Sequence, residues 1–409
     1  MRIVELTNVQ FDEYAKYNPL TNYCQTSKYA LLMTNYGYTY DYIGYIDDSN
    51  TIKAAALILK KRLQGKNKYG YSPKGFLINY YDKELVKNFL LDLRKYYKRE
   101  NLVFIKFNPE IIIGETDKTK DYSISYNGNV NIIDELKSQN TKRRLEAKEF
   151  ELLEPKMSAY INLKNYSVNN IDRTFRKKIR KSSRKGLSIQ IGTPRDIDIL
   201  FNMIKKKSKK SINYYRDFYN TFSKDNSVDL LLLQVDLREY QQETYNIYTK
   251  EKDNNERINQ IFFQNQSKNY QQKVNSDKRL EAYKSECSIA AELAKKQDKD
   301  IIAAALIVKH YNRITVIVSG YKDEYKKLYP NTYMYHAIFE RYKEYFDFCD
   351  LNGVTGDFSQ KSEYVGLNQS KLKFNPKVYE FIGEFDLICN DHTFNKLIKT
   401  SFIEDELIK

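Results

Sequence analysis

Two stretches that lie far apart in the sequence share one pattern of small and branched apolar residues. Residues 54–61 read Ala-Ala-Ala-Leu-Ile-Leu-Lys-Lys, and residues 303–310 read Ala-Ala-Ala-Leu-Ile-Val-Lys-His. A short apolar run of this kind is typical of a buried strand. After the first run we predict a further strand at 75–80 and then a helix at 83–99. After the second run we predict a strand at 314–319 and a helix at 333–345. Alanine-rich strands also recur by chance, but a duplicated mixed α/β domain is the simplest interpretation.

A long segment without glycine or proline lies between Pro194 and Gly320. Such a segment favours long helices. Within it, apolar and polar residues recur at alternating spacings of three and four, as in the seam of a coiled coil, at Leu237, Tyr240, Thr244, Ile247, Glu251, Asn254, Ile258 and Ile261. A second run has the same spacing, at Leu280, Tyr283, Cys287, Ala290 and Ala294.

The polar stretch Gln264 to Asn269 separates these two runs and predicts a bend. We therefore expect residues 236–298 to form an antiparallel helical hairpin inserted between two strands. Two surface helices packed flat on a core remain the alternative. The expected organisation is a first domain at 1–155, with part of the C-terminal region packing back on it, and a second domain at 156–235 and 299–409.

The composition favours a folded protein with an anionic partner. The 409 residues include 41% hydrophobic residues, enough for two or three cores. The net charge of +15 suits RNA or an anionic membrane surface. A bias toward Lys, Asn, Ile and Tyr in an AT-rich genome is the alternative, and 37 Tyr with no Trp fit it equally well.

The few cysteines and histidines are scattered along the chain. The 4 Cys form no C-x-x-C pair and the 3 His form no metal-ligand spacing, so we expect no cofactor, no metal and a reduced cytoplasm. We see no signal peptide and no apolar run of the ~20 residues that a membrane span needs. The expected location is the cytoplasm, with docking at the inner face of the plasma membrane left open.

Two basic clusters follow the first predicted domain. One contains the candidate RNA-binding residues Arg176, Lys177, Arg180, Lys181 and Arg184. The other spans residues 205–210 and leads into Tyr214, Tyr215 and Arg216. Basic side chains bind phosphates and neighbouring aromatic rings stack on unpaired bases, although a charge run is more often a solvated helix face.

The C-terminal third carries several short motifs in a fixed order. It reads Asp-Leu-Asn-Gly-Val-Thr-Gly-Asp-Phe at 350–358, Tyr-Val-Gly-Leu at 364–367, Ser-Lys-Leu-Lys-Phe at 370–374 and Glu-Phe-Ile-Gly-Glu-Phe-Asp at 380–386. This series resembles the Fem family of tRNA-dependent peptidoglycan bridge aminoacyltransferases, in the form with a helical arm. Several motifs in order are more specific than any one of them.

The resemblance extends upstream over nearly the whole chain. Segments 24–29, 72–80, 104–110, 176–186 and 205–219 look like further family motifs. It implies an α/β (α+β) fold of tandem GNAT-like acyltransferase domains with an inserted antiparallel coiled-coil hairpin. It further implies an enzyme that moves an amino acid, often Gly, Ala or Ser, from aminoacyl-tRNA to the stem or bridge peptide of a peptidoglycan precursor. The implied acceptor is lipid-linked or UDP-linked, and the implied state is a monomer or weak homo- or hetero-dimer.

The resemblance also implies site residues. Lys371 stands where the family has a lysine near the reacting ester, which would support the developing oxyanion. Ser370 and Lys373 flank it, but they replace an aromatic and a small residue of the family pattern. Asn108 stands where the family usually has Asp, and an amide cannot act as a general base. Glu110 is a substitute whose orientation on a strand stays open.

A second group of implied site residues lies near the second basic cluster. Lys210 stands where the family has an arginine and is a candidate for binding precursor phosphates. A lysine binds a phosphate as a point charge, whereas an arginine can donate two parallel hydrogen bonds to it. Tyr215, Arg216 and Tyr219 lie beside it in the sequence, and a core or surface role is equally open for the two tyrosines. Two rival functions remain: a coenzyme A-dependent N-acyltransferase, and a non-catalytic RNA-binding or scaffold protein.

Overall fold

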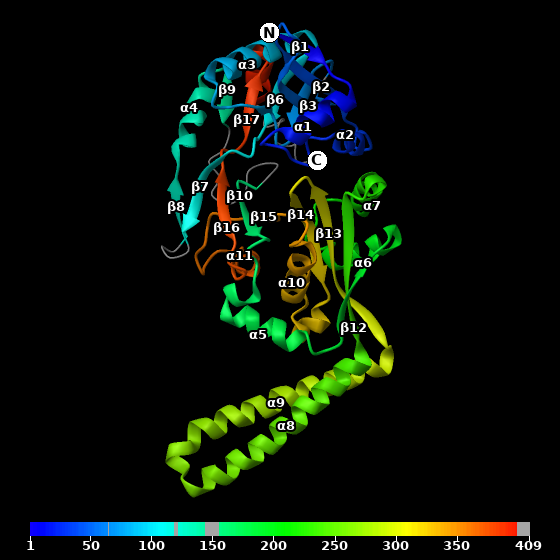
Figure 1. Cartoon of the computed structure of the whole chain (residues 1–409), viewed down its shortest axis with the longest axis vertical. Coiled ribbons are helices and arrows are strands. Elements are labelled where there is room, and N and C mark those ends of the chain that lie inside the picture. The colour runs from blue at the N-terminus through cyan, green and yellow to red at the C-terminus, as the bar shows by residue number, and fades with distance from the viewer. Residues whose placement is uncertain (64, 118–121, 144–154, 399–409) are drawn as a thin grey trace.

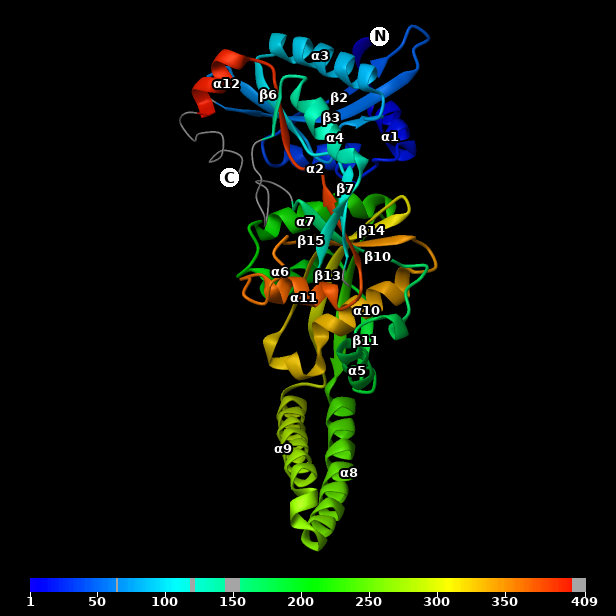
Figure 2. The same ribbon diagram turned by 90° about the vertical axis from the view of Figure 1, so that its left-hand side faces the viewer.

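A computed structural model describes residues 1–63, 65–117, 122–143 and 155–398 of the chain. The described residues form two mixed β-sheets with helices on their faces, stacked along the long axis of the molecule (Figure 1). A pair of long helices extends from the second sheet and forms the end opposite the N-terminus, as the turned view also shows (Figure 2).

The first sheet has eight strands among the described residues. In spatial order they are β1 (Arg2–Glu5), β2 (Thr39–Ile46), β3 (Ile52–Arg62), β4 (Lys68–Ser72), β6 (Leu102–Phe107), β17 (Phe385–Ile388) and β9 (Thr141–Arg143), with β5 (Leu77–Ile78) paired to β3. Neighbours are antiparallel except β4 and β6, which run parallel.

The second sheet has nine described strands. Their spatial order is β11 (Leu187–Ile191), β12 (Val228–Asp236), β13 (Lys299–His310), β14 (Arg313–Tyr321), β15 (Phe348–Val354), β10 (Met157–Asn162), β16 (Lys377–Phe381), β7 (Ile112–Asp117) and β8 (Ser123–Tyr126). Strands β14 and β15 are parallel and pair over three residues, from Arg313 opposite Phe348 to Thr315 opposite Asp350. Beyond that point these two strands are no longer paired with each other.

The two sheets exchange strands. Strands β7 and β8 follow the first sheet in sequence but pair into the second, because β7 lies antiparallel to β16. Strand β17 comes from the C-terminal region and pairs with β6 of the first sheet. The sheets therefore do not divide at residue 155, and the domain division stays a prediction. Residues 399–409, assigned to the second domain, lie outside the described residues.

Helices pack on both sheets. Helices α1 (Asn8–Tyr17), α2 (Ser27–Thr34), α3 (Lys83–Arg99), α4 (Asn131–Lys137) and α12 (Asp391–Ile398) accompany the first. Helices α5 (Arg173–Ser182), α6 (Ile197–Ile204), α7 (Ile212–Phe222), α10 (Pro330–Tyr342) and α11 (Val365–Leu372) accompany the second. Helix α3 forms as predicted: the Asp82 side chain caps the Leu85 N–H, and Phe89 and Leu93 lie on its buried face.

The two alanine-rich runs are confirmed as buried strands. They form the centres of β3 and β13, where successive side chains are buried on both faces. Other boundaries shift. The strand predicted at 75–80 is reduced to β5, and α10 starts at Pro330 rather than at Tyr333. Proline suits the first turn of a helix because its missing N–H is not needed there.

The helical hairpin is confirmed. Helices α8 (Leu237–Gln264) and α9 (Gln266–Lys296) pack along each other and turn at Asn265, inside the predicted bend. We call this pair the arm. Its polar middle is built around Asn255 rather than Asn254, since the Asn255 amide is buried and donates to Ser276 Oγ at 3.0 Å.

A shared interface holds the two sheets together. Helix α2 of the first packs on α7 of the second, and the Tyr36 hydroxyl donates to Asp217 Oδ2 at 2.8 Å. One hydrophobic core runs through this contact and includes buried Leu57 and Leu306, one from each central strand. The two sheets are therefore packed as one body.

Candidate active site between the two sheets

An ion pair between the sheets organises the candidate site. Glu110 follows β6 of the first sheet, and Arg313 begins β14 of the second. Arg313 Nη1 donates to Glu110 Oε2 at 2.9 Å and to the Tyr160 hydroxyl at 3.0 Å, and its Nη2 donates to the Thr21 carbonyl at 3.2 Å. Arginine suits such a site because its planar fork can serve several acceptors at once. Glu110 thus points toward the second sheet, which answers the question that the sequence left open.

Lys74 approaches the same carboxylate from the first sheet. Its Nζ lies 3.7 Å from Glu110 Oε1. Burial raises the pKa of Glu110, but the charges of Arg313 and Lys74 and a hydrogen bond from Asn22 outweigh it and hold the pKa below its ordinary value. Glu110 is consequently an ionised carboxylate between two cations.

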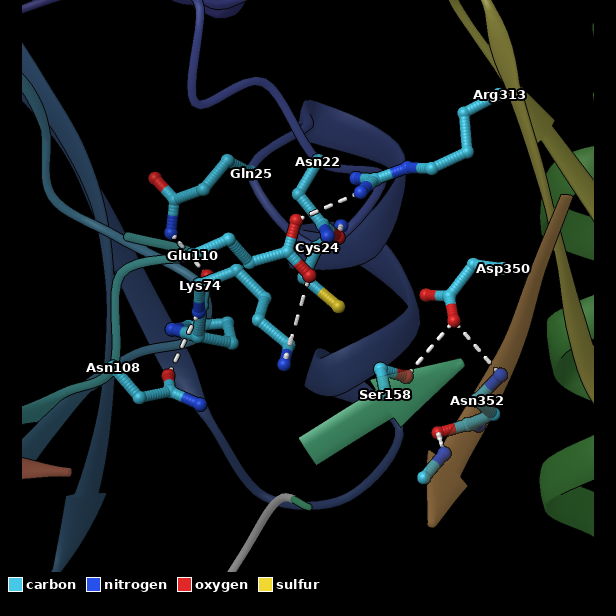
Figure 3. Close-up of polar contacts among 12 residues, drawn as sticks. Asn22, Cys24, Gln25, Lys74, Asn108, Glu110, Ser158, Arg313, Asp350 and Asn352 are labelled. Atoms are coloured by element: carbon cyan, nitrogen blue, oxygen red, sulfur yellow. Dashed lines mark hydrogen bonds and ion pairs between the residues drawn. The ribbon is translucent and has the colours of Figure 1, made fainter. Parts of the chain in front are cut away.

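Asp350 of β15 faces this group from the other side (Figure 3). Its Oδ1 accepts from Ser158 Oγ at 2.9 Å and from the Asn352 backbone N–H at 2.8 Å. Burial raises the pKa of Asp350, and the nearby charge of Arg313 only partly offsets this. We refer to Lys74, Glu110, Tyr160, Arg313 and Asp350 as the inter-sheet cluster.

Lys371 lies on α11, next to the end of β15. Its side chain is buried, and its Nζ donates to the Gly353 carbonyl at 2.6 Å. Burial lowers the pKa of Lys371 to about 8, although the charge of Asp350 acts in the opposite direction. A lysine of this kind is charged below that pH and can stabilise negative charge that develops at the end of β15.

Asn108 has a positioning role in this structure. It is buried, and its Oδ1 accepts from the Lys74 backbone N–H at 2.8 Å. Lys74 has a φ of +55°, a left-handed backbone conformation that is unfavourable for lysine and needs such support. Gln25 supports the same turn, since its Nε2 donates to the Pro73 carbonyl at 2.7 Å. Asn108 therefore holds the turn that presents Lys74 to Glu110.

The second predicted group lies apart from the inter-sheet cluster. Lys210 is exposed, with its Nζ 5.3 Å from the centre of the Tyr214 ring. The other three residues, all on α7, make contacts with α6 and nearby loops. The Tyr215 hydroxyl lies 2.9 Å from Ser208 Oγ, and Arg216 donates to Asp198 at 2.5 Å. The Tyr219 hydroxyl donates to the Gly192 carbonyl at 3.3 Å. The described contacts do not bring these four side chains to Glu110, Asp350 or Lys371.

Ser370 and Lys373 line a pocket at the start of α10. We call it the α10 pocket, and it is lined by Phe175, Lys178, Tyr321, Lys326, Tyr329, Pro330, Asn331, Thr332, Gly366, Gln369, Ser370 and Lys373. Two of its lysines share one ring, since Lys178 Nζ and Lys373 Nζ lie 4.8 and 5.7 Å from the centre of Phe175. Burial and then the charge of Lys373 lower the pKa of Lys178. An anion between them, at a helix N-terminus, would relieve this repulsion.

The candidate tRNA-binding residues continue from this pocket along α5. Lys177, Arg180 and Arg184 are exposed, and the Arg176 guanidinium donates to the Asn169 carbonyl at 3.3 Å. Lys181 is exposed and lies 5.9 Å from the centre of the Tyr283 ring at the base of the arm. The basic face of α5 thus connects the α10 pocket to the arm.

Sequence reasoning missed Lys74, Tyr160, Arg313 and the site role of Asp350. A signal existed for two of them, because Lys74 and Asp350 lie inside segments that resemble family motifs. Nothing in the local pattern marks Tyr160 or Arg313, since they meet Glu110 only through the packing of the sheets.

Comparison with known proteins identifies the class of protein. The sequence model of the FemAB family matches residues 6–399. The chain therefore belongs to the FemAB family, as its motifs indicated.

Individual relatives agree with this assignment. The chain is 24% identical to an aminoacyltransferase FemA of Staphylococcus epidermidis, over 97% of this chain and 98% of that protein. It is 22% identical to a lipid II:glycine glycyltransferase of Staphylococcus aureus, over 95% of this chain and 93% of that protein. A crystal structure of FemX superimposes with a TM-score of 0.73 at 18% identity and covers 97% of this chain and 100% of that chain. This likeness confirms the predicted α/β fold.

In the described part of the chain, none of the helices combines the length and apolar character needed to cross a bilayer.

Proposed function

We propose that this protein transfers an aminoacyl group from aminoacyl-tRNA to an amine on the stem or bridge peptide of a peptidoglycan precursor. The observation that carries the proposal is its FemAB membership over residues 6–399, a span that includes the arm and every described strand of both sheets except β1. The named relatives are an aminoacyltransferase and a lipid II:glycine glycyltransferase. The reaction exchanges an ester for an amide, so positioning and charge stabilisation can supply much of the rate.

The donor would bind through the α10 pocket and the exposed face of α5. Lys178, Lys326 and Lys373 give the pocket positive charge, and Phe175 and Tyr329 give it aromatic surface. This combination suits the single-stranded end of a tRNA, whose phosphates need cations and whose bases stack on rings. Arg176, Lys177, Arg180, Lys181 and Arg184 would contact phosphates of the adjoining stem.

The acceptor would enter between the sheets. Lys371, which donates to the Gly353 carbonyl at the end of β15, would stabilise the oxyanion formed when the amine attacks the ester. Asn108 would act indirectly, by holding the turn that presents Lys74. Lys210, with Tyr215, Arg216 and Tyr219 near it, would contact a more distant part of the precursor, and Ser370 would contact the donor.

Several finer statements belong to the same proposal. The acceptor is lipid-linked, as in the name of the S. aureus relative, and the protein would then work at the membrane surface on its cytoplasmic side. The amino acid is Gly, Ala or Ser. The protein acts as a monomer or a weak dimer. It is built from two acyltransferase domains, 1–155 with part of the C-terminal region packing back on it and 156–235 with 299–409, and an arm at 236–298, with β7 and β8 exchanged into the second sheet.

The test is transfer in vitro. The protein is incubated with lipid-linked or UDP-linked muropeptide and with total tRNA charged with one radiolabelled amino acid at a time. We expect label to enter the muropeptide with one of Gly, Ala or Ser, and ribonuclease treatment of the charged tRNA to abolish it. Absence of transfer with every amino acid and both acceptors would contradict the proposal.

A coenzyme A-dependent N-acyltransferase is a second candidate function, and one observation favours it. The α10 pocket, with three lysines at a helix N-terminus, would also suit the diphosphate of coenzyme A. Acyl-coenzyme A with the same acceptors, in the presence of ribonuclease, tests this alternative directly. Ribonuclease-resistant acylation would favour the coenzyme A enzyme. A protein that binds tRNA and shows neither reaction would be the non-catalytic relative.

A further inference from the structure

Asp350 occupies the point where the two parallel strands of the second sheet separate. It pairs with Thr315 at the last paired position of β14 and β15, and both strands continue beyond it. Its neighbour on the other side is Tyr160 of β10. The residue is 7% exposed, so it is largely removed from water.

Hydrogen bonds orient the Asp350 carboxylate, and the Tyr160 hydroxyl on the neighbouring strand also interacts with it. Oδ1 accepts from Ser158 Oγ and from the Asn352 N–H, which fixes the orientation of the group. The other oxygen points toward the side of the space where Glu110 and Lys74 lie (Figure 3). The structure thus presents an oriented carboxylate to the space in which we propose that the acceptor amine binds.

We propose that Asp350 accepts the proton that the attacking amine releases, and that it thereby supplies the carboxylate that Asn108 lacks. This inference rests on the function proposed above. Asn108 is an amide committed to the Lys74 backbone, so it cannot take a proton. The inter-sheet cluster contains two carboxylates, and their surroundings differ.

The two carboxylates are suited to different tasks. Glu110 lies between the Arg313 guanidinium and the Lys74 ammonium, which hold its pKa down and make it a weak base. Asp350 has no cation within ion-pairing distance among the described contacts, and burial raises its pKa. A general base works best when its pKa lies closer to the working pH, which favours Asp350 over Glu110.

The charged and titratable groups around Asp350 come from every neighbouring element. Arg313 faces it from β14 and Tyr160 from β10, Glu110 lies across the interface, Lys371 lies on α11, and Cys349 precedes it. Arg313 lowers its pKa and Glu110 raises it. The Arg313 guanidinium, hydrogen-bonded to Tyr160 and Glu110, keeps the net charge of the cluster close to balance when Asp350 is ionised.

The proposed step balances as follows. The neutral amine nitrogen attacks the carbonyl carbon of the aminoacyl ester, and a C–N bond forms while the carbonyl oxygen becomes an oxyanion. The extra N–H proton passes to the Asp350 carboxylate. When the intermediate collapses, the bond between the carbonyl carbon and the ribose oxygen breaks, and protonated Asp350 returns the proton to that oxygen. The products are the amide and tRNA with a free hydroxyl, and Asp350 is again ionised.

The test uses D350N, because asparagine keeps the Oδ1 acceptor for Ser158 and Asn352 and removes only the basic oxygen. We expect kcat for transfer to fall by roughly 100-fold or more, with KM for aminoacyl-tRNA and for muropeptide each changed less than about threefold. In the pH profile of log kcat, the acidic limb should lose one unit of slope, because one fewer group must be deprotonated. A matched control is D229N, which removes a carboxylate on β12 that pairs with Lys309 at 2.9 Å, and it should retain wild-type kcat.

Each outcome decides the matter. D350N with more than about one third of wild-type kcat, or with a lower kcat and an unchanged slope, overturns the inference and leaves the proposed function intact. Wild-type protein without transfer overturns both. Should D350N fail to fold by circular dichroism, D350E replaces it: a retained acidic limb supports the inference, and a lost limb overturns it. Loss of the limb in E110Q but not in D350N would assign the proton to Glu110 instead.

Discussion

Arg313 Nη1 lies 2.9 Å from Glu110 Oε2, and this ion pair joins the second sheet to the first. The two side chains are separated by 203 residues in sequence. Both are largely buried, so the pair holds two charges that water cannot stabilise well. The arrangement of the candidate site therefore depends on a contact that exists only when both sheets are in place.

The first prediction concerns this ion pair. Arg313→Met should leave Glu110 buried next to Lys74 alone and lower the free energy of unfolding by about 3–5 kcal/mol. The double variant R313M/E110Q should lose less, because the second change removes the uncompensated carboxylate. Urea unfolding measures both. Comparison with E110Q alone completes the cycle, and a double-variant loss equal to the sum of the two single-variant losses would mean that the two side chains do not interact energetically.

The second prediction concerns His310 at the end of β13. Its Nε2 is hydrogen-bonded to Thr21 Oγ1 at 2.8 Å, and burial, followed by the charges of Arg313 and Lys28, lowers its pKa to about 4. The unfolded chain binds this proton at higher pH than the folded protein. His310 therefore stabilises the fold fully above pH 6.5, and this contribution is lost as the pH falls from 6.5 toward about 4.

His310→Gln should remove this pH dependence, which we expect to reach about 3 kcal/mol at pH 4. Urea unfolding of both proteins between pH 4 and pH 8 gives the difference directly. Parallel curves for the two proteins over that range would rule out a stabilising role for neutral His310.

The third prediction concerns Lys371. If its charge stabilises the oxyanion, transfer should decline as the pH rises through about 8, where the side chain loses its proton. K371A should lower kcat by about 100- to 1,000-fold, and K371R should move the alkaline limb to higher pH because arginine stays charged. A K371A variant that folds, binds tRNA and transfers at the wild-type rate would exclude the role.

The fourth prediction concerns the α10 pocket. Lys178→Ala and Lys373→Ala should each raise KM for aminoacyl-tRNA and reduce the slope of log affinity against log salt by about one, without changing KM for the muropeptide. Lys137→Ala, an exposed lysine on α4, is the matched control and should change neither quantity. A uniform effect of all three variants would point to non-specific charge attraction.

The fifth prediction concerns the arm. Residues 236–298 contain 11 basic and 11 acidic residues, so the net charge of +15 comes entirely from the rest of the chain. Replacing residues 241–293 by a short Gly-Ser turn should therefore leave the salt dependence of tRNA binding unchanged. A slope reduced by two or more would show that the arm contacts phosphates after all.

The sequence by itself determined the elements whose signals are local. The apolar runs at 54–61 and 303–310, the helix at 83–99 and the breaker-free hairpin at 236–298 can be predicted because hydrophobic periodicity and chain breakers act over a few residues. The ordered motifs of the C-terminal third also identified the family, since their order and spacing survive where overall identity is low.

Only the tertiary structure decided which strands share a sheet and which side chains meet. The transfer of β7 and β8 to the second sheet depends on pairing between segments hundreds of residues apart, and so does the identity of β17 as the C-terminal strand that joins the first sheet. Strand β6 ends at Phe107, so the alternation of a strand no longer governs Glu110, and its contact with Arg313 could not be inferred. The separation of β14 and β15 at Asp350 is likewise a property of the packed sheet, because no local pattern records where two strands part.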